Sequence, residues 1–125
     1  MKRDIELVRK ILLRVEEKFE PGTGWINNLK IDHYEMETVA EHCDLLYQNK
    51  LIREYKPFYA DDQIYSFGVG PLTQEGYHFL DQIRDETTWK KTVKEINEKN
   101  LPGTIETYGC VAASIAGAFL REYNR

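Results

Sequence analysis

The chain has 125 residues, of which 42% are hydrophobic and 30% are charged, and its net charge is −4. This length suits one domain with a single core, and the acidic balance argues against nonspecific binding to nucleic acid or anionic membranes. The longest apolar run, residues 111–120, is about half of what a bilayer requires, and the charged start does not resemble a secretory signal. We therefore expect a cytoplasmic protein without membrane contact.

The first half of the chain predicts a helix, a strand and a second helix. Residues 4–19 place apolar side chains three and four apart, which is typical of an amphipathic helix, with Asp4 as its N-cap. Residues 25–32 alternate in polarity and predict a short strand. Residues 35–49 return to helical spacing, with Cys43 on the apolar face.

A β-hairpin and three helices are predicted next. Residues 51–59 and 63–69 are rich in β-branched and aromatic side chains and flank an Asp-Asp turn. Thr73 is placed to cap the following helix, Asp85 or Thr87 to begin the next, and Thr104 to cap the last.

This order of elements predicts an α+β fold that is mostly α. We expect a winged-helix-like core over residues 1–72, made of helix, strand, helix and β-hairpin wing. The three C-terminal helices, residues 73–125, would pack on it as part of a single domain. The chain departs from the usual winged helix because the short positioning helix has no room between Asp32 and Glu35.

Three stretches carry a resemblance to a known family: MKRDIELVRKILLRVEE at residues 1–17, HCDLLYQNKLI at 42–52, and LTQEGYHFLDQIRDETTWKK at 72–91. They are similar to a group of short phage- and prophage-encoded proteins of unknown function with a winged-helix core. The resemblance implies that fold and a phage context, and it implies no activity. The family tends to carry His where Tyr77 stands and Gly where Lys50 stands, so we expect Asn49 to take the left-handed turn after the second helix.

The second predicted helix has the spacing of a DNA-reading helix but the wrong charge. Glu37, Glu41 and Asp44 lie at i, i+4 and i+7 and form one acidic edge, whereas Lys50 is the one base between residues 35 and 50. Carboxylates at this edge would repel a phosphate backbone. The sequence favours a protein partner for this edge, or an acidic solvated face, over a DNA groove.

A dimeric DNA-binding transcriptional regulator is the alternative function. It would use side chains that can contact phosphates or base edges. A basic stripe on the first helix supplies three of them, although such a stripe is also an ordinary solvated face. The candidate contacts are Arg3, Lys10, Arg14, Gln48, Lys50, Arg53 and Lys56.

No constellation of residues predicts catalysis. The three histidines are isolated and lack the spacing of metal ligands. Cys43 lies on an apolar helix face where burial would raise its pKa, and Cys110 begins an apolar run and is expected in the core. No nucleophile elbow or phosphate-binding glycine loop is present. We expect no enzyme, no cofactor and no metal site.

Small residues recur four apart in the last predicted helix, at Ala112, Ala113, Ala116 and Gly117. Such a face lets another helix approach closely. It indicates either packing within the chain or a homodimer through this helix, and the sequence does not choose between them.

The predicted wing carries the aromatic residues Tyr55, Phe58, Tyr59, Tyr65 and Phe67. Aromatic side chains on strands can stack on bases, but that mode needs a positive groove, which the sequence lacks. Cross-strand pairing that stabilises the hairpin is the plainer interpretation.

Overall fold

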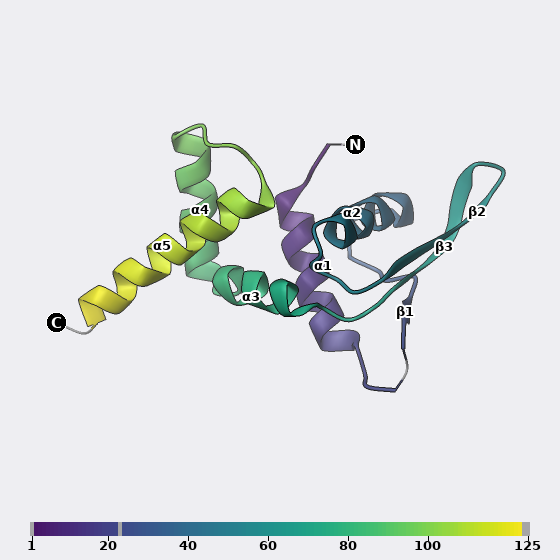
Figure 1. The fold of residues 1–125 in the computed structure, drawn as a ribbon. Coiled ribbons are helices and arrows are strands. Elements are labelled where there is room, and N and C mark those ends of the chain that lie inside the picture. Colours follow the sequence, from purple (N-terminus) through teal and green to yellow (C-terminus); the bar gives the residue numbers. More distant parts are fainter. Residues whose placement is uncertain (1, 23, 124–125) are drawn as a thin grey trace. The chain divides into compact units, whose positions relative to one another are not determined.

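The computed structural model describes residues 2–22 and 24–123, and over these residues it forms five helices and one three-stranded antiparallel sheet (Figure 1). The elements are α1 (Ile5–Lys18), β1 (Ile26–Asn27), α2 (Met36–Gln48), β2 (Tyr55–Ala60), β3 (Gln63–Val69), α3 (Gln74–Ile83), α4 (Glu86–Glu98) and α5 (Ile105–Tyr123). This α+β, mostly helical arrangement confirms the predicted class and element order. The chain divides into two compact units, Met1–Tyr77 and His78–Arg125.

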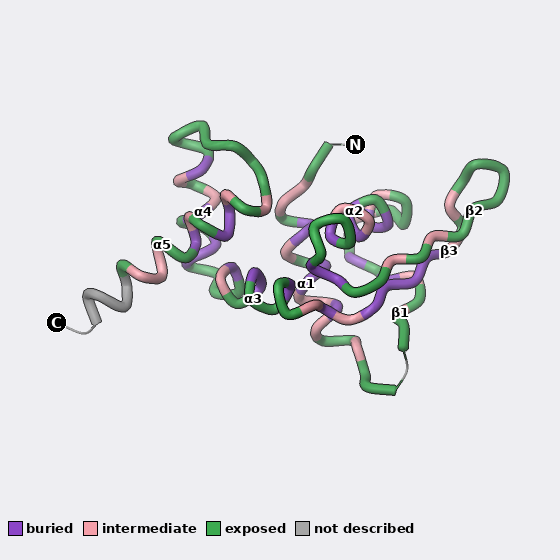
Figure 2. Tube along the Cα trace, viewed as in Figure 1, coloured by how far each residue is buried: buried purple, intermediate pink, exposed green. Residues whose placement is uncertain are grey.

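Helix α1 begins where predicted because Asp4 caps it. The Asp4 Oδ1 atom accepts hydrogen bonds from the backbone N–H groups of Glu6 and Leu7, at 3.0 and 3.2 Å. These bonds satisfy two donors that have no partner inside the helix. Buried positions recur along α1 (Figure 2), and the helix packs on α2. Its buried side chains are Leu7, Val8, Ile11, Leu12 and Val15.

The predicted strand over residues 25–32 is wrong in length, since β1 contains two residues. Asn28 ends it by adopting a left-handed conformation with φ of 51°. The Asn28 Oδ1 atom accepts from the Ser66 hydroxyl at 3.0 Å and from the Phe67 N–H at 2.9 Å. A side chain therefore replaces the backbone ladder at this point.

The sheet has the order β1-β3-β2, with Ile26 opposite Val69, so the first strand lies beside the hairpin as predicted. In the described segment between β1 and α2 there is no helix. Residues 51–54 were predicted within a strand and are not part of one. Ile52 makes a single bridge to Leu72 instead, which draws together the two ends of the hairpin segment.

The aromatic residues of the hairpin pair across its strands, as predicted. The rings of Tyr55 and Phe67 lie 6.3 Å apart and those of Phe58 and Tyr65 lie 6.4 Å apart, between centroids. The register shifts between the pairs Phe58–Ser66 and Tyr59–Ile64, which leaves Tyr65 as an extra residue in a β-bulge.

The turn after α2 corrects one expectation. Lys50 takes the left-handed conformation with φ of 62°, while Asn49 has φ of −88°. Asn49 instead caps the helix end, because its side-chain amide donates to the Leu45 carbonyl at 2.8 Å. Lys50 therefore holds a backbone conformation that favours glycine, and its Cβ adds a steric cost there.

Replacing Lys50 by glycine is expected to raise the free energy of unfolding of the Met1–Tyr77 unit by about 0.5–1 kcal/mol, because glycine adopts positive φ without strain. Lys50→Ala, which removes the charge and keeps the Cβ, is the control and should give little gain. Urea unfolding curves of both variants provide the measurement. Equal stabilisation by both would attribute the effect to charge.

Two of the family-like stretches meet where α3 begins. The Leu51 carbonyl accepts from the Thr73 N–H at 3.0 Å, and the Thr73 hydroxyl donates to the Lys50 carbonyl. Thr73 also caps α3, since its hydroxyl oxygen accepts from the Gly76 N–H at 2.9 Å. A Cβ on Gly76 would lie 2.0 Å from the Leu51 carbonyl oxygen, so this contact requires glycine.

In the second unit, α4 begins at the Asp85 cap, whose Oδ2 accepts from the Thr88 N–H at 2.8 Å. Helices α4 and α5 pack through the rings of Trp89 and Tyr108, with centroids 5.6 Å apart. Thr104 caps α5 as predicted, accepting from the Thr107 N–H at 3.1 Å. No helix among the described residues combines the length and the apolar character needed to cross a bilayer.

The small residues of α5 have different surroundings. Ala112 is buried, Ala113 is exposed, and Ala116 and Gly117 are half-buried. Within the described chain, nothing lies within 4 Å of a Cβ built on Gly117, whereas one on Gly109 would lie 2.9 Å from Gln82 Oε1. Packing inside the unit explains Gly109 and leaves Gly117 unexplained.

Candidate functional site

The acidic edge of α2 faces away from the core. Glu37 and Glu41 are exposed and Asp44 is half-buried, while the opposite side of the helix holds Cys43 and Leu46 in the interior. Helix α2 therefore has an acidic side that faces solvent and an apolar side that faces the core. The three carboxylates form what we call the acidic edge.

Tyr55 places the acidic edge next to the wing. Burial raises the pKa of the Tyr55 hydroxyl above its ordinary value, and the neighbouring Tyr59, Asp44 and Glu41 raise it further. Helix α2 contacts β2, so Glu41 and Asp44 border the surface of β2 that carries Tyr55 and, four residues later, Tyr59. The Tyr59 side chain is 62% exposed on this surface.

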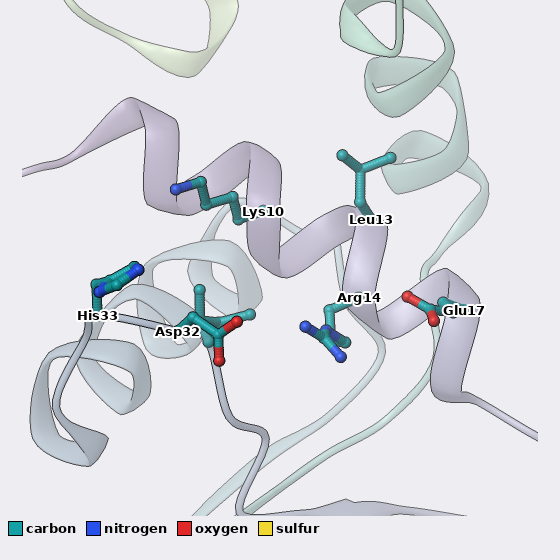
Figure 3. A pocket seen from close by; sticks show the side chains of 7 residues that line it. Lys10, Leu13, Arg14, Glu17, Asp32 and His33 are labelled. Atoms are coloured by element: carbon teal, nitrogen blue, oxygen red, sulfur yellow. The ribbon is translucent and has the colours of Figure 1, made fainter.

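Two cations of α1 line a cleft of about 380 Å³ at the first helix. Figure 3 shows the side chains of Lys10 and Arg14 from α1 and of Asp32 and His33 from the loop before α2. His33 holds a left-handed backbone with φ of 73°. Lys10 lies 5.7 Å from the ring centroid of Tyr34. Because Asp32 and Glu17 share this cleft, a phosphate entering it would meet both signs of charge.

The remaining candidate nucleic-acid contacts lie elsewhere. Gln48, Lys50 and Arg53 line a second, open cleft of about 780 Å³ together with Glu54 and Glu75. Lys56 lines a third cleft on the sheet. Arg3 is exposed ahead of α1. The structure therefore divides the predicted cations among separate sites.

His42 has a structural role that its position in the acidic helix did not reveal. The imidazole is buried, with 1% exposure, and its Nε2 atom accepts from the Asp4 N–H at 2.9 Å. Its Nδ1 atom lies 2.8 Å from the Thr38 carbonyl and therefore carries the proton. His42 thus joins α2 to the cap of α1.

The cap residue Asp4 extends this link to the loop before α2. The Tyr34 hydroxyl donates to Asp4 Oδ2 at 2.9 Å, and this hydrogen bond raises the pKa of Tyr34. One aspartate thereby contacts α1, α2 and the intervening loop. Helical spacing could have predicted the burial of His42, because it lies three residues after the buried Val39 and four before the buried Leu46.

The two cysteines differ in environment. Burial raises the pKa of the Cys43 thiol to about 12, as expected for its apolar face. Cys110 is exposed, so its predicted place in the core is wrong. It lies on the side of α5 opposite the buried Tyr108 and Ala112, about 200° around the helix from Tyr108. Over the described residues, no three His, Cys, Asp or Glu side chains come together to hold a metal ion.

Comparison with known proteins identifies the family. The model of the hypothetical protein family DUF2513 matches residues 2–102, and the chain belongs to this family. An uncharacterized protein of Haemophilus influenzae is 31% identical over 120 residues, which cover 96% of this chain and 99% of that relative. No solved structure matches the chain.

Proposed function

We propose that this chain is a non-enzymatic winged-helix module of phage or prophage origin that binds another protein. The phage origin rests on the three stretches that resemble phage-encoded proteins. The winged-helix assignment is supported by the order helix, strand, helix, hairpin and by the sheet order β1-β3-β2. In this assignment α2 occupies the place of the reading helix and the hairpin is the wing.

The single observation that carries the proposal is the surface that α2 and β2 form together. Helix α2 contacts β2, Glu41 and Asp44 lie on the Tyr55 side of that strand, and Tyr59 follows four residues later on the same face with an exposed ring. Aromatic side chains are enriched at protein interfaces, and carboxylates select a basic counterpart. A protein with a basic, partly apolar face is the partner that this surface fits.

Reversing the charge of the acidic edge is expected to abolish capture of that partner. The variant Glu37→Lys with Asp44→Lys changes the local charge by four units, and like charges across an interface cost several kcal/mol. The measurement is affinity purification from the bacterial host after prophage induction, with the partner identified by mass spectrometry. The control, Glu98→Lys with Glu106→Lys, makes the same change of charge in the second unit.

Two outcomes would contradict the proposal. Undiminished capture by the Glu37/Asp44 variant, with its circular dichroism unchanged, would remove the acidic edge from the interface. Equal loss by both variants would indicate dependence on net charge alone.

A DNA-binding regulator is the second candidate function, and one observation favours it. Gln48, Lys50 and Arg53 share the cleft at the end of α2, where base or phosphate contacts would be made. A dimer through α5 would complete such a regulator, and the open space at Gly117 supports that part of the proposal. This candidate requires affinity for random duplex DNA that falls steeply between roughly 50 and 200 mM salt. Absence of binding at the lower concentration eliminates it.

A further inference from the structure

The face of the sheet turned away from Tyr59 carries a small aromatic slot. A cleft of about 190 Å³ is lined by Trp25, Asn27, Lys56, Phe58 and Gly68. Asn27, Gly68 and Lys56 are direct partners across all three strands, so they share one face. Phe58 joins them because it lies two residues beyond Lys56, whereas Tyr59 points to the other face.

Gly68 keeps the floor of the slot flat. A Cβ at this position would lie 3.1 Å from Cε3 of Trp25 and 3.6 Å from Oδ1 of Asn27. The indole therefore lies against the bare backbone of β3. Both aromatic walls remain open, since Trp25 is 38% and Phe58 41% exposed. Tyr65, the residue of the bulge, packs beside Phe58 and extends the apolar rim.

The polar groups of the slot define the ligand further. Among the described residues that line it, Lys56 alone is charged, and the Lys56 Nζ atom lies 6.0 Å from the centroid of the Phe58 ring. The cation–π contact holds an ammonium group at the rim. The Asn27 side chain can donate from its NH2 group to a backbone carbonyl and accept at its Oδ1 atom from a backbone N–H group. The slot thus fits a compact apolar ring with a carboxylate close to it.

We propose that this slot binds a proline ring in an extended segment of a partner protein, with an acidic residue next to the proline. Proline-containing segments dock between aromatic side chains because their extended conformation is preformed and costs little entropy to bind. The carboxylate of the segment pairs with Lys56. The slot and the acidic edge lie on opposite faces of the hairpin, so this inference does not depend on the acidic edge.

The charges of the surrounding surface favour a peptide over single-stranded nucleic acid. A nucleic acid also stacks on aromatic rings, but it needs a positive path for successive phosphates. Here Glu54 lies beside Gly70, two residues before Lys56, with its Cβ 3.2 Å from a Cβ built on Gly70. Asp61 and Asp62 form the hairpin turn. A single carboxylate is tolerated between these acids and a polyanion is repelled.

The test uses the fluorescence of the full chain. Trp25 is 38% exposed and the second tryptophan, Trp89, is 3% exposed, so a ligand in the slot changes the emission of Trp25. The probes are the capped peptides EPPPE, KPPPK and EAAAE and a short oligothymidylate, each titrated at low salt. We expect a saturable change with EPPPE, at least tenfold weaker binding of KPPPK, and none with EAAAE.

Variants assign the binding to the slot. Phe58→Ala is expected to weaken binding of EPPPE by about tenfold or more, and Tyr59→Ala, an exposed ring on the other face of the same strand, is the matched control and should leave it unchanged. Lys56→Glu should reverse the preference so that KPPPK binds better than EPPPE, a result that mere unfolding cannot give. Absence of saturable binding by EPPPE, or tighter binding of oligothymidylate than of EPPPE, would overturn the proposal.

Discussion

The variant Gly76→Ala is expected to lower the free energy of unfolding of the Met1–Tyr77 unit by about 3 kcal/mol. An alanine Cβ would lie 2.0 Å from the Leu51 carbonyl oxygen, and backbone atoms cannot rotate away as a side chain can. The start of α3 must therefore move, which breaks the hydrogen bond from the Thr73 N–H to Leu51. The intrinsic preference of helices for alanine, worth about 1 kcal/mol, is outweighed.

Urea unfolding followed by circular dichroism measures this loss, and two controls locate it. Gln74→Ala changes an exposed neighbour in the same turn and should stay within about 0.5 kcal/mol of the natural chain. Gly117→Ala makes the same substitution in a helix with open space, so it should raise stability by up to about 1 kcal/mol. Natural stability in Gly76→Ala would mean that α3 does not lie against Leu51 in solution.

The sequence predicted best the features that depend on neighbouring residues. The caps at Asp4, Thr73 and Thr104 were found because each side chain bonds to N–H groups two or three residues ahead. Helix spacing likewise revealed α1 and α2, and the hairpin turn followed from two consecutive aspartates. All of these are local, so the order of residues is sufficient to find them.

The features that were missed depend on residues far apart in the chain. Asn28 ends β1 through bonds to Ser66 and Phe67, and no pattern within residues 25–32 encodes those partners. Trp25 covers Gly68, so the aromatic slot is visible only when β1 and β3 are paired. Burial of His42 likewise depends on the Asp4 N–H, 38 residues away.

The candidate site shows the same division. The acidic edge follows from helical spacing and needs no tertiary information. The position of this edge beside the tyrosines of β2 does need it, because β2 must fold back against α2 before Tyr55 comes near Glu41 and Asp44. The predicted cations illustrate the converse. The sequence analysis grouped them because they share a charge, but folding places Lys10 and Lys56 in separate clefts.

The reaction of Cys43 with thiol reagents is expected to be several orders of magnitude slower than the reaction of Cys110. At pH 8 a thiol with a pKa of about 12 is ionised to about one part in ten thousand, against about a tenth for a thiol with the ordinary pKa of 9.0. The exposed fraction of Cys43 is 0%, which also excludes the reagent. A chromogenic disulfide reagent should therefore titrate one thiol in the folded chain and two in urea.

The same burial makes the unit less stable in alkali. The unfolded thiol ionises above its ordinary pKa of 9.0, whereas the folded thiol stays protonated up to about 12. The contribution of the protonated Cys43 thiol to the free energy of unfolding is therefore fully present below pH 9 and is lost as the pH rises from there toward 12. Rapid labelling of both thiols at pH 8, with the helical signal intact, would contradict the buried position of Cys43 on α2.

Labelling of Cys43 also connects the two predictions, because the reagent reaches this thiol only when α2 opens. Where opening is fast relative to labelling, the rate follows the population of the open form. A loss of about 3 kcal/mol in Gly76→Ala should then accelerate labelling of Cys43 about a hundredfold and leave Cys110 unchanged. A lowered urea midpoint without this acceleration would mean that the Leu51–Gly76 contact and α2 open separately. A hundredfold increase would place both in one cooperative unit, on which the acidic edge and the aromatic slot are built.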